Sequence, residues 1–216
     1  MTTLYVDIET APPPLGISEG LALDKQPPAN YRDPKKIEAF RRANAGKGWR
    51  RLSLDVFRAE VLCVGWAIDD EPVTVSTLSE FAGSAMRVNL DAVVAANGFG
   101  FDWPILWAAL VRLGDYATAR EVAAWFTGKP WDVVAVDVLK ACESWGVYGK
   151  SAPSLDILCR LFSVPSPKDG IDGSQVLDTW LSGEEGRQTV RDYCARDVDA
   201  LREVHVRLKA TGRVSR

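Results

Sequence analysis

The sequence lacks several of the motifs that identify common enzyme classes. It contains a single histidine, His205, which excludes His-Glu-x-x-His zinc sites and argues against a Ser-His-Asp triad. It has no Gly-x-x-x-x-Gly-Lys-Ser/Thr phosphate loop and no Gly-x-Gly-x-x-Gly dinucleotide motif. His205 lies among apolar residues of an expected C-terminal helix, where a structural role fits it best. Any chemistry that this chain performs must therefore rest on carboxylates.

Cysteine pairs and long apolar runs are also missing. The four cysteines form no Cys-x-x-Cys pair and lie in apolar segments, so we expect them to be reduced core residues: Cys63, Cys142, Cys159 and Cys194. No stretch approaches the about 20 apolar residues that cross a bilayer. The polar start, Met1 to Thr3, does not resemble a signal peptide. We therefore expect an intracellular protein without a membrane partner.

The overall composition is that of a globular protein. With 216 residues, of which 47% are hydrophobic and 25% are charged, the chain suits one substantial domain, residues 1–216. Residues 11–57 are proline-rich and poor in apolar side chains, so we interpret them as an excursion between two strands.

The charge of the chain is unevenly distributed. Residues 32–51 carry eight basic residues against Asp33 and Glu38, a net +6 in a chain whose net charge is −3, so the remainder carries −9. A basic arm on an acidic body can grip a phosphate backbone. We therefore expect this segment to hold a nucleic acid.

Hydrophobic periodicity predicts an α/β protein. Apolar or alternating runs predict strands over residues 4–8, 61–68, 73–78, 92–96 and 131–136. Helical patterns cover residues 35–42, 79–88 with Ser79 as a cap, 103–113, 116–126, 138–145, 155–162 capped by Ser154, and 186–209. A hairpin followed by alternating strands and helices predicts a mixed central β-sheet flanked by helices. Ligands of such sheets gather beyond the carboxyl ends of the central strands.

The first strand carries two carboxylates. Asp7 and Glu9 are two residues apart, so on a strand both would project from the same face. Two like charges on an apolar strand repel each other and lose hydration unless a positive group, most simply a divalent metal ion, lies between them. The alternative is that the strand ends at Val6 and that both acids are solvated turn residues before Pro12.

The last predicted helix carries a third carboxylate toward the body of the protein. Its apolar stripe has helical spacing: Val190, Cys194, Val198, Leu201, Val204 and Leu208. Tyr193 and Asp197 are four residues apart on a face that overlaps this stripe. Asp197 must therefore pair with an arginine or bind metal, whereas Tyr193 alone is typical of a core tyrosine.

These acids, with Asp102 at a strand-to-helix junction, suit a metal site. Oxygen ligands of this kind favour Mg²⁺ or Mn²⁺, and four carboxylates can hold two divalent metal ions about 3.5 to 4 Å apart. Such a pair of ions is a phosphoryl-transfer device.

Three motifs in this order resemble those of a known superfamily. Asp7-Ile8-Glu9, Asn97-x-x-x-Phe101-Asp102 and Tyr193-x-x-x-Asp197 are similar to the exonuclease motifs of the DnaQ-like (DEDD) 3′–5′ exonucleases. The tyrosine four residues before the last aspartate resembles the DEDDy branch, which includes the proofreading domains of family A and family B DNA polymerases. Residues 152–201 are similar to stand-alone family B-like exonucleases of phages and bacteria. The resemblance implies a ribonuclease H-like fold.

The resemblance also implies roles for individual residues. The ligands of two Mg²⁺ or Mn²⁺ ions would be Asp7, Glu9, Asp102 and Asp197. Tyr193 would orient the attacking water or help to deprotonate it, Thr10 would contact the terminal nucleotide, and Asn97 and Phe101 would hold the strand. We add that Trp103 could stack on a terminal base, the alternative being a core tryptophan paired with Trp107. Asp137, which ends a strand, is either a helix cap or a group that supports the ligands.

The activity implied is 3′–5′ exonuclease cleavage that releases mononucleotides from 3′ ends of DNA, single-stranded or frayed. Proofreading would require a separate DNA polymerase as partner, since polymerase motifs are absent from the chain. The sequence leaves replication proofreading, repair and recombination open as roles, and the expected location is the cytoplasm of a bacterial cell or a phage-infected host. Two alternatives stay open: an exoribonuclease resembling ribonuclease D, and a non-catalytic nucleic-acid-binding or polymerase-partner module.

Overall fold

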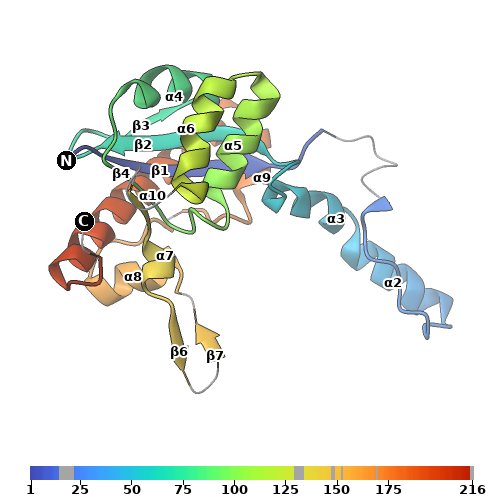
Figure 1. Ribbon diagram of the computed structural model, residues 1–216. Coiled ribbons are helices and arrows are strands. Elements are labelled where there is room, and N and C mark those ends of the chain that lie inside the picture. The colour runs from blue at the N-terminus through green and yellow to red at the C-terminus, as the bar shows by residue number, and fades with distance from the viewer. Residues whose placement is uncertain (15–21, 129–133, 147–148, 152, 169, 215–216) are drawn as a thin grey trace.

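A five-stranded sheet lies at the centre of the protein (Figure 1). The computed structural model describes residues 1–14, 22–128, 134–146, 149–151, 153–168 and 170–214. The strand order is β3-β2-β1-β4-β5, with bounds β1 Thr3–Ala11, β2 Glu60–Ile68, β3 Thr74–Ser76, β4 Ala92–Ala95 and β5 Val134–Asp137. The predicted strand at residues 131–136 is confirmed from Val134 onward, and its first three residues lie outside the described part of the chain.

The sheet is mixed, as predicted. β1 pairs with β2, and β2 with β3, in antiparallel fashion, whereas β1–β4 and β4–β5 are parallel pairs. The carboxyl ends of β1, β4 and β5 therefore meet at one edge of the sheet. β1 continues through Asp7 and Glu9 to Ala11, so the alternative in which the strand stops at Val6 is wrong.

Helices cover both faces of the sheet (Figure 1). One face is covered by α4 (Leu78–Ser84), α5 (Asp102–Leu113) and α6 (Tyr116–Thr127). The other face is covered by α7 (Val138–Ala141), α8 (Leu155–Phe162), α9 (Val176–Leu181) and the long α10 (Glu184–Ala210). Successive residues of β1 pack on opposite faces: Leu4 and Val6 join the core beneath α5, and Tyr5 joins the core beneath α10. This is a ribonuclease H-like α/β arrangement.

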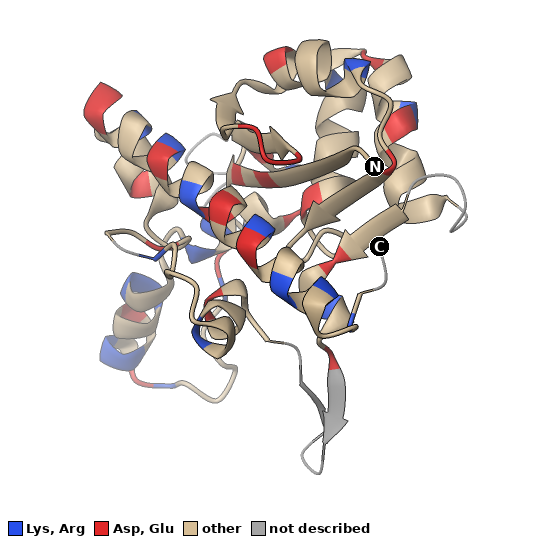
Figure 2. Cartoon of the chain, turned by 90° about the vertical axis from the view of Figure 1, so that its left-hand side faces the viewer, with Lys and Arg blue, Asp and Glu red and all other residues tan. Residues whose placement is uncertain are grey.

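α10 is buried along its predicted stripe and charged on its outward face (Figure 2). Exposed ion pairs such as Arg187–Glu184 and Arg207–Glu203 line that face. His205 is buried, and its Nδ1 lies 3.1 Å from the hydroxyl of Tyr5, which confirms its structural role. No helix in the described residues has the length and apolar character that a membrane crossing requires.

Several elements differ from the prediction, among them α3 (Lys47–Arg50), which was not predicted. α4 is capped by Thr77 rather than Ser79, because Thr77 and Glu80 form a reciprocal capping box. The helix predicted at residues 138–145 ends at Ala141, and β6 (Ser144–Gly146) with β7 (Gly149–Ser151) forms a two-stranded hairpin instead. Trp145 is a strand-favouring residue followed by Gly146, and periodicity over so short a segment does not separate the two structures. α9 was not predicted, since it has only six residues.

The basic excursion forms an arm that stands off from the body (Figure 1). Residues 22–51, called the arm from here on, contain α2 (Pro34–Asn44) and α3 (Lys47–Arg50), and neither helix has a buried residue. A 3₁₀ turn, Arg51–Leu54, leads back to the body, where Leu52 is buried. The arm leaves the body beyond the carboxyl end of β1. The amino end of β1 lies at the opposite end of the molecule, where the Thr2 N–H donates to Asp91 at 2.7 Å.

Candidate active site

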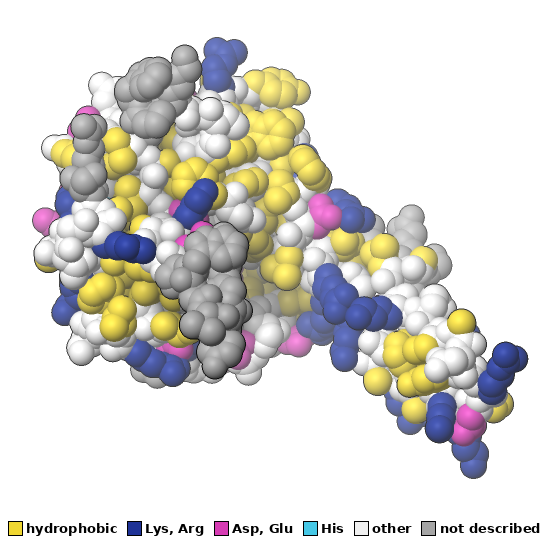
Figure 3. Space-filling model, turned by 60° about the horizontal axis from the view of Figure 1, so that its bottom comes forward, with side chains coloured by type: hydrophobic (Ala, Val, Ile, Leu, Met, Phe, Trp, Pro, Cys, Tyr) yellow, Lys and Arg dark blue, Asp and Glu magenta, His cyan; other side chains and the backbone are white. Residues whose placement is uncertain are grey.

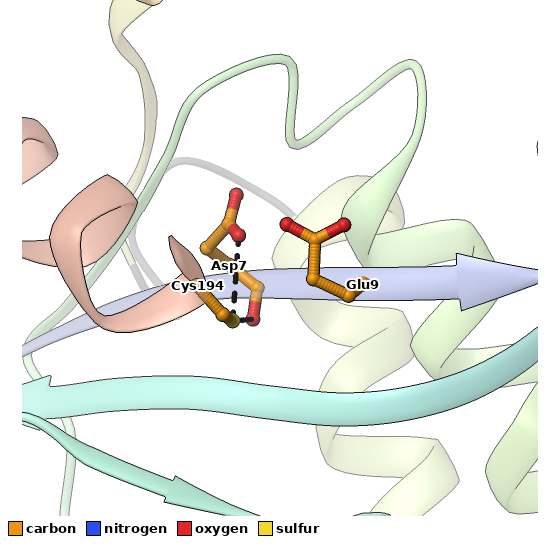
Figure 4. Close-up of side chains that lie close together, drawn as sticks. All are labelled: Asp7, Glu9 and Cys194. Carbon is orange, nitrogen blue, oxygen red and sulfur yellow. Dashed lines mark hydrogen bonds between the residues drawn. The ribbon is translucent and has the colours of Figure 1, made fainter. Parts of the chain in front are cut away.

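β1 presents Asp7 and Glu9 on the face of the sheet that α10 covers. Because side chains alternate along a strand, the burial of Leu4, Val6 and Ile8 against the α5 side turns both acids to the other side. Figure 4 shows the two carboxylates side by side. The pairing register of β1 with β2 shifts between Glu9 and Thr10. Such strand irregularities change the direction of side chains and are common near active sites. The predicted geometry of this pair is therefore confirmed.

α10 adds Tyr193 and Asp197, both buried, because it packs directly on the backbone of β2. Gly65, opposite Asp7 in the sheet, makes this approach possible. A Cβ atom at Gly65 would lie 2.8 Å from Sγ of Cys194 and 3.0 Å from Cγ2 of Val198. A side chain here would push α10, and with it Asp197, away from β1.

α5 supplies Asp102 as its first residue. The loop after β4 reaches it through Gly98, where a Cβ atom would lie 2.5 Å from the indole ring of Trp103. Asp102 is only 2% exposed, and its Oδ2 has no hydrogen-bond partner among the described residues. A buried carboxylate oxygen without a partner is costly, so its position indicates a ligand that is supplied from outside the chain.

Asp137 holds the loop that leads to Asp102. It is 6% exposed at the end of β5 and accepts four backbone N–H bonds. Its Oδ1 accepts from Leu139 at 3.0 Å and Lys140 at 3.1 Å, which caps α7. The same carboxylate accepts from Asn97 at 3.1 Å and Phe99 at 3.3 Å. Asp137 is therefore both a helix cap and a clamp on the Asn97–Phe99 loop, the two roles considered for it from the sequence.

Burial and mutual repulsion dominate the electrostatics of the four acids. Burial raises the pKa of Asp7 well above its ordinary value, and the charges of Asp197, Asp102 and Glu9 raise it further. Burial, followed by the charge of Asp197, also raises the pKa of Glu9 well above its ordinary value. These mutual influences mean that the four carboxylates lie within electrostatic reach of one another.

The other two acids show the same pattern. Burial raises the pKa of Asp102 to about 8, although backbone hydrogen bonds at Asp102 and Ile8 act in the opposite direction. Burial raises the pKa of Asp197 to about 6 against the lowering effects of the Tyr193 hydroxyl, Arg196 and Lys168. Two cations beside Asp197 do not balance four buried acids, so full ionisation of the cluster requires added positive charge.

The donor atoms fit a hard divalent cation. Ligand atoms of Asp7, Glu9 and Cys194 all lie within 4.8 Å of one another. The Sγ of Cys194 lies 3.6 Å from Oδ2 of Asp7 and 3.8 Å from its carbonyl oxygen, so both oxygens are within reach of its single S–H donor. A hydrogen bond with the Cys63 thiol, together with burial, raises the pKa of Cys194 well above its ordinary value. A neutral thiol leaves the carboxylate oxygens as ligands, a set that suits Mg²⁺ or Mn²⁺.

The four residues expected to bind substrate differ in their exposure and in their hydrogen bonds. The hydroxyl of Thr10 donates to the carbonyl of Ser53 at 2.8 Å, so this proton is not available to a nucleotide. Asn97 is exposed and has a φ of +73°, and Phe101 is half-buried at the start of α5. Trp103 is 0% exposed and packs edge-on against Phe99 at 4.7 Å between ring centroids. The stacking role suggested for Trp103 is therefore corrected: it is a core tryptophan, and its ring partner is Phe99 rather than Trp107.

Sequence reasoning missed two residues that shape the site. Gly65 and Cys194 come together only because β2 and α10 pack on each other, although they are far apart in the chain. The one local signal is a glycine inside an otherwise β-branched and apolar strand, which is typical of a close backbone approach.

Comparisons with known proteins give a family and a fold for this chain. The model of a family described as "Predicted 3'-5' exonuclease related to the exonuclease domain of PolB" matches residues 69–213, which include Asp102, Tyr193 and Asp197. Asp7 and Glu9 precede the matched segment. A comparison with curated proteins finds no match.

A solved structure shares the fold. The family B DNA polymerase from the hyperthermophilic archaeon Pyrobaculum calidifontis superposes with a TM-score of 0.50 at 18% sequence identity, over 96% of this chain. The chain spans 24% of the length of that polymerase. Since the family model matches more than half of the residues, the chain belongs to the family of predicted 3′–5′ exonucleases related to the exonuclease domain of PolB.

Proposed function

We propose that this protein is a metal-dependent 3′–5′ exodeoxyribonuclease that releases mononucleotides from single-stranded or frayed 3′ ends of DNA. The observation that supports the proposal most directly is the convergence of buried acids from three elements. β1 contributes Asp7 and Glu9, α5 contributes Asp102, and α10 contributes Asp197. Their raised pKa values and the unpartnered Oδ2 of Asp102 are what a cation site without its cation would produce.

The four carboxylates are the proposed ligands of two divalent ions, Mg²⁺ or Mn²⁺. When bound, such ions supply a hydroxide-like nucleophile and stabilise the leaving oxygen of a phosphodiester. The protein contributes the positions of the ligands. Asp102 is positioned by the loop that Asp137 clamps, and Asp197 by the contact of α10 with Gly65.

Tyr193 is the proposed group that orients the attacking water. Burial, and next the charge of Asp197, raise the pKa of its hydroxyl above the ordinary value, so the phenol keeps its proton throughout the physiological range. A protonated phenol acts as a hydrogen-bond partner and not as a base. Asn97 and Phe101, on the loop beside Asp102, are the proposed contacts of the terminal nucleotide. In proofreading, a separate DNA polymerase would be the partner that delivers the 3′ end.

A time course of cleavage tests the proposal. A 5′-labelled single-stranded DNA oligonucleotide and its RNA counterpart are incubated with Mg²⁺, Mn²⁺ or EDTA and resolved on a gel. We expect a ladder that shortens from the 3′ end with metal, no cleavage in EDTA, and faster cleavage of DNA than of RNA. Mononucleotides in the released fraction would establish exonucleolytic cleavage.

The other outcomes are equally informative. Faster cleavage of RNA would replace the proposal with the exoribonuclease alternative. Intact oligonucleotides in every lane, together with measurable binding, would replace it with the non-catalytic binding module. The variant Asp192→Asn is a matched control for substitutions in α10, because Asp192 is exposed on the outward face of the same helix and should leave cleavage unchanged.

A further inference from the structure

The basic arm carries cations that the folding of the chain does not require. Lys35 and Lys36 lie in the first turn of α2, where the helix dipole disfavours positive charge, and this turn contains no acid. All eight basic residues between positions 32 and 51 are exposed. Of these, Arg42 pairs with Glu38 and Arg50 pairs with Asp178, and within the described residues the other six make no ion pair.

Hydrogen bonds within the arm nonetheless fix its conformation. The Asp33 carboxylate accepts from the Lys35 N–H at 2.9 Å and caps α2. The two oxygens of Asp24 accept from the Gly46 N–H at 2.8 Å and the Gly48 N–H at 2.9 Å, which fixes the turn between α2 and α3. These bonds hold the cations in a defined arrangement.

The base of the arm is anchored at the edge of the candidate active site. The indole N–H of Trp49 donates to the carbonyl of Pro13 at 2.8 Å, four residues beyond Glu9. The guanidinium of Arg50 donates two bonds, at 2.7 and 3.2 Å, to the carboxylate of Asp178 on α9. The arm therefore points away from the body, while its base is bonded to the segment that follows β1 and to α9 (Figure 1).

A groove of about 400 Å³ lies within the arm. It is lined by Asp24, Lys25, Gln26, Arg41, Arg42 and Ala45. The one carboxylate in this lining, Asp24, already accepts two backbone N–H bonds, so the groove offers Lys25 and Arg41 to a ligand, while Arg42 pairs with Glu38. Figure 3 shows basic side chains grouped along the arm, in contrast to the mixed charges of the body.

We propose that the arm is a clamp for the phosphodiester backbone of the substrate strand. This proposal rests on the exonuclease function proposed above. The strand would run from its 3′ end at the carboxylates, past the anchor at Trp49, and along α2, with phosphates on Lys35, Lys36, Arg41 and the groove. α2, with 11 residues, spans about 16 Å, the rise of about five phosphates of one DNA strand.

The charge distribution makes such a clamp necessary. The chain carries −3 overall, while residues 32–51 carry +6. An acidic body repels a polyanion beyond the reach of any bound metal, so the arm supplies the long-range attraction. A strand too short to reach the arm from the carboxylates gains nothing from it, so the clamp predicts that affinity rises with oligonucleotide length until the strand spans the arm.

A pair of triple variants tests the clamp. The arm variant is Lys35→Gln/Lys36→Gln/Arg41→Gln, and the control removes three exposed cations from the body, Arg87→Gln/Arg120→Gln/Lys209→Gln. Both sets lack ion pairs among the described residues and change the net charge equally. Binding of a labelled 20-nucleotide single strand is measured in EDTA at several salt concentrations.

We expect the arm variant to bind about tenfold or more weakly at low salt. Its slope of log affinity against log salt should be shallower by about 2, since each phosphate contact on a single strand contributes about 0.7. The control should keep the slope of the unmodified protein. A 4-nucleotide strand has only three phosphodiesters and should lose less affinity in the arm variant than the 20-nucleotide strand does. Equal slopes for the arm variant and the control would overturn the clamp.

A second substrate separates the clamp from the catalytic proposal. The p-nitrophenyl ester of thymidine 5′-monophosphate reaches the carboxylates without reaching the arm. The arm variant should hydrolyse this ester at the unmodified rate while degrading the 20-nucleotide strand more slowly at limiting concentration. Binding through the arm without hydrolysis by the unmodified protein would defeat the nuclease proposal and leave the clamp standing. Hydrolysis with arm-independent binding would defeat only the clamp.

Discussion

The Oδ1 of Asp137 accepts a hydrogen bond from the backbone N–H of Asn97 at 3.1 Å, across the ends of two neighbouring parallel strands. A second bond, from Phe99 at 3.3 Å, makes the carboxylate a two-point clamp on the loop that delivers Asp102. Asn97 has a left-handed φ of +73°, so this loop is held in a conformation that it would not favour alone.

Replacing Asp137 by alanine should release this loop. We expect a destabilisation of about 1–3 kcal/mol from the loss of buried hydrogen bonds, and weaker activation of cleavage by Mn²⁺ because Asp102 is displaced. Asp137→Asn is the matched variant, since its amide oxygen can still accept from the N–H groups that Oδ1 serves. A metal titration of activity should therefore rank the unmodified protein first, the asparagine variant second and the alanine variant last. An unchanged titration for Asp137→Ala would show that the hydrogen bonds from the loop to Asp137 do not influence the metal site.

Asp7→Ala should abolish hydrolysis without unfolding the protein. Removal of one proposed ligand should lower the rate on single-stranded DNA by about a thousandfold or more, since the metal-dependent step is lost. In EDTA the variant should be at least as stable as the unmodified protein, because one buried like charge is gone. Melting curves and the gel assay together check both parts, with Asp192→Asn as the control. Retained cleavage would refute the assignment of Asp7.

The metal-free protein should lose stability as the pH rises. The pKa of Asp102 is about 8 in the folded chain against 3.8 ordinarily, so between these values the folded state holds a proton that the unfolded state has released. The free energy of unfolding therefore falls with rising pH across this window. We expect the melting temperature in EDTA to drop by roughly 5 °C or more from pH 5 to pH 8.

Two comparisons isolate the cause of this drop. Asp102→Asn should flatten the pH dependence, whereas Asp192→Asn should not. Added Mn²⁺ should raise the melting temperature most at pH 8, where the released protons no longer compete with it. A melting temperature that rises with pH in EDTA would contradict the prediction.

Gly65→Ala should separate α10 from the sheet. The new Cβ would lie 2.8 Å from Sγ of Cys194, so we expect a destabilisation of about 1–3 kcal/mol. Displacement of Asp197 by even about 1 Å should also lower the cleavage rate by as much as a hundredfold. Urea unfolding and the gel assay measure these effects. Gly83→Ala is the matched control, because nothing lies within 4 Å of a Cβ there.

The cause can be tested by relieving the contact. The double variant Gly65→Ala/Cys194→Ala removes the nearest atom and should recover part of the stability, though not all, since Cγ2 of Val198 stays 3.0 Å away. Additive losses in the double variant would mean that the sulfur contact is not responsible.

The sequence predicted the parts of the site that depend on local periodicity. Asp7 and Glu9 share a face because a strand alternates, and Tyr193 and Asp197 share a face because a helix repeats every 3.6 residues. The strand-to-helix junction at Asp102 follows from an apolar strand, a glycine-rich loop and a proline in the first helical turn. These features need no knowledge of the rest of the fold, and the order of the three motifs supplied the family resemblance.

The parts that were missed depend on contacts between distant segments. The burial of Trp103 is decided by the approach of Gly98 to its ring, and the contact of Cys194 with Asp7 by the packing of α10 on β2. The clamp by Asp137 requires β4 and β5 to be neighbours in register, with Ala95 opposite Asp137. Periodicity along one segment carries no information about which segment lies beside it.

The attachment of the first strand at Asp91 has a practical consequence. The Thr2 N–H is bonded to Asp91 at 2.7 Å, at the end of the molecule opposite the arm. A flexible tether joined to Met1 would therefore emerge far from both the carboxylates and the basic helices. The protein can be immobilised on a glass or sensor surface through that end while the carboxylates and the arm stay open to a long single strand in solution, which would allow single-molecule recording of the proposed stepwise cleavage.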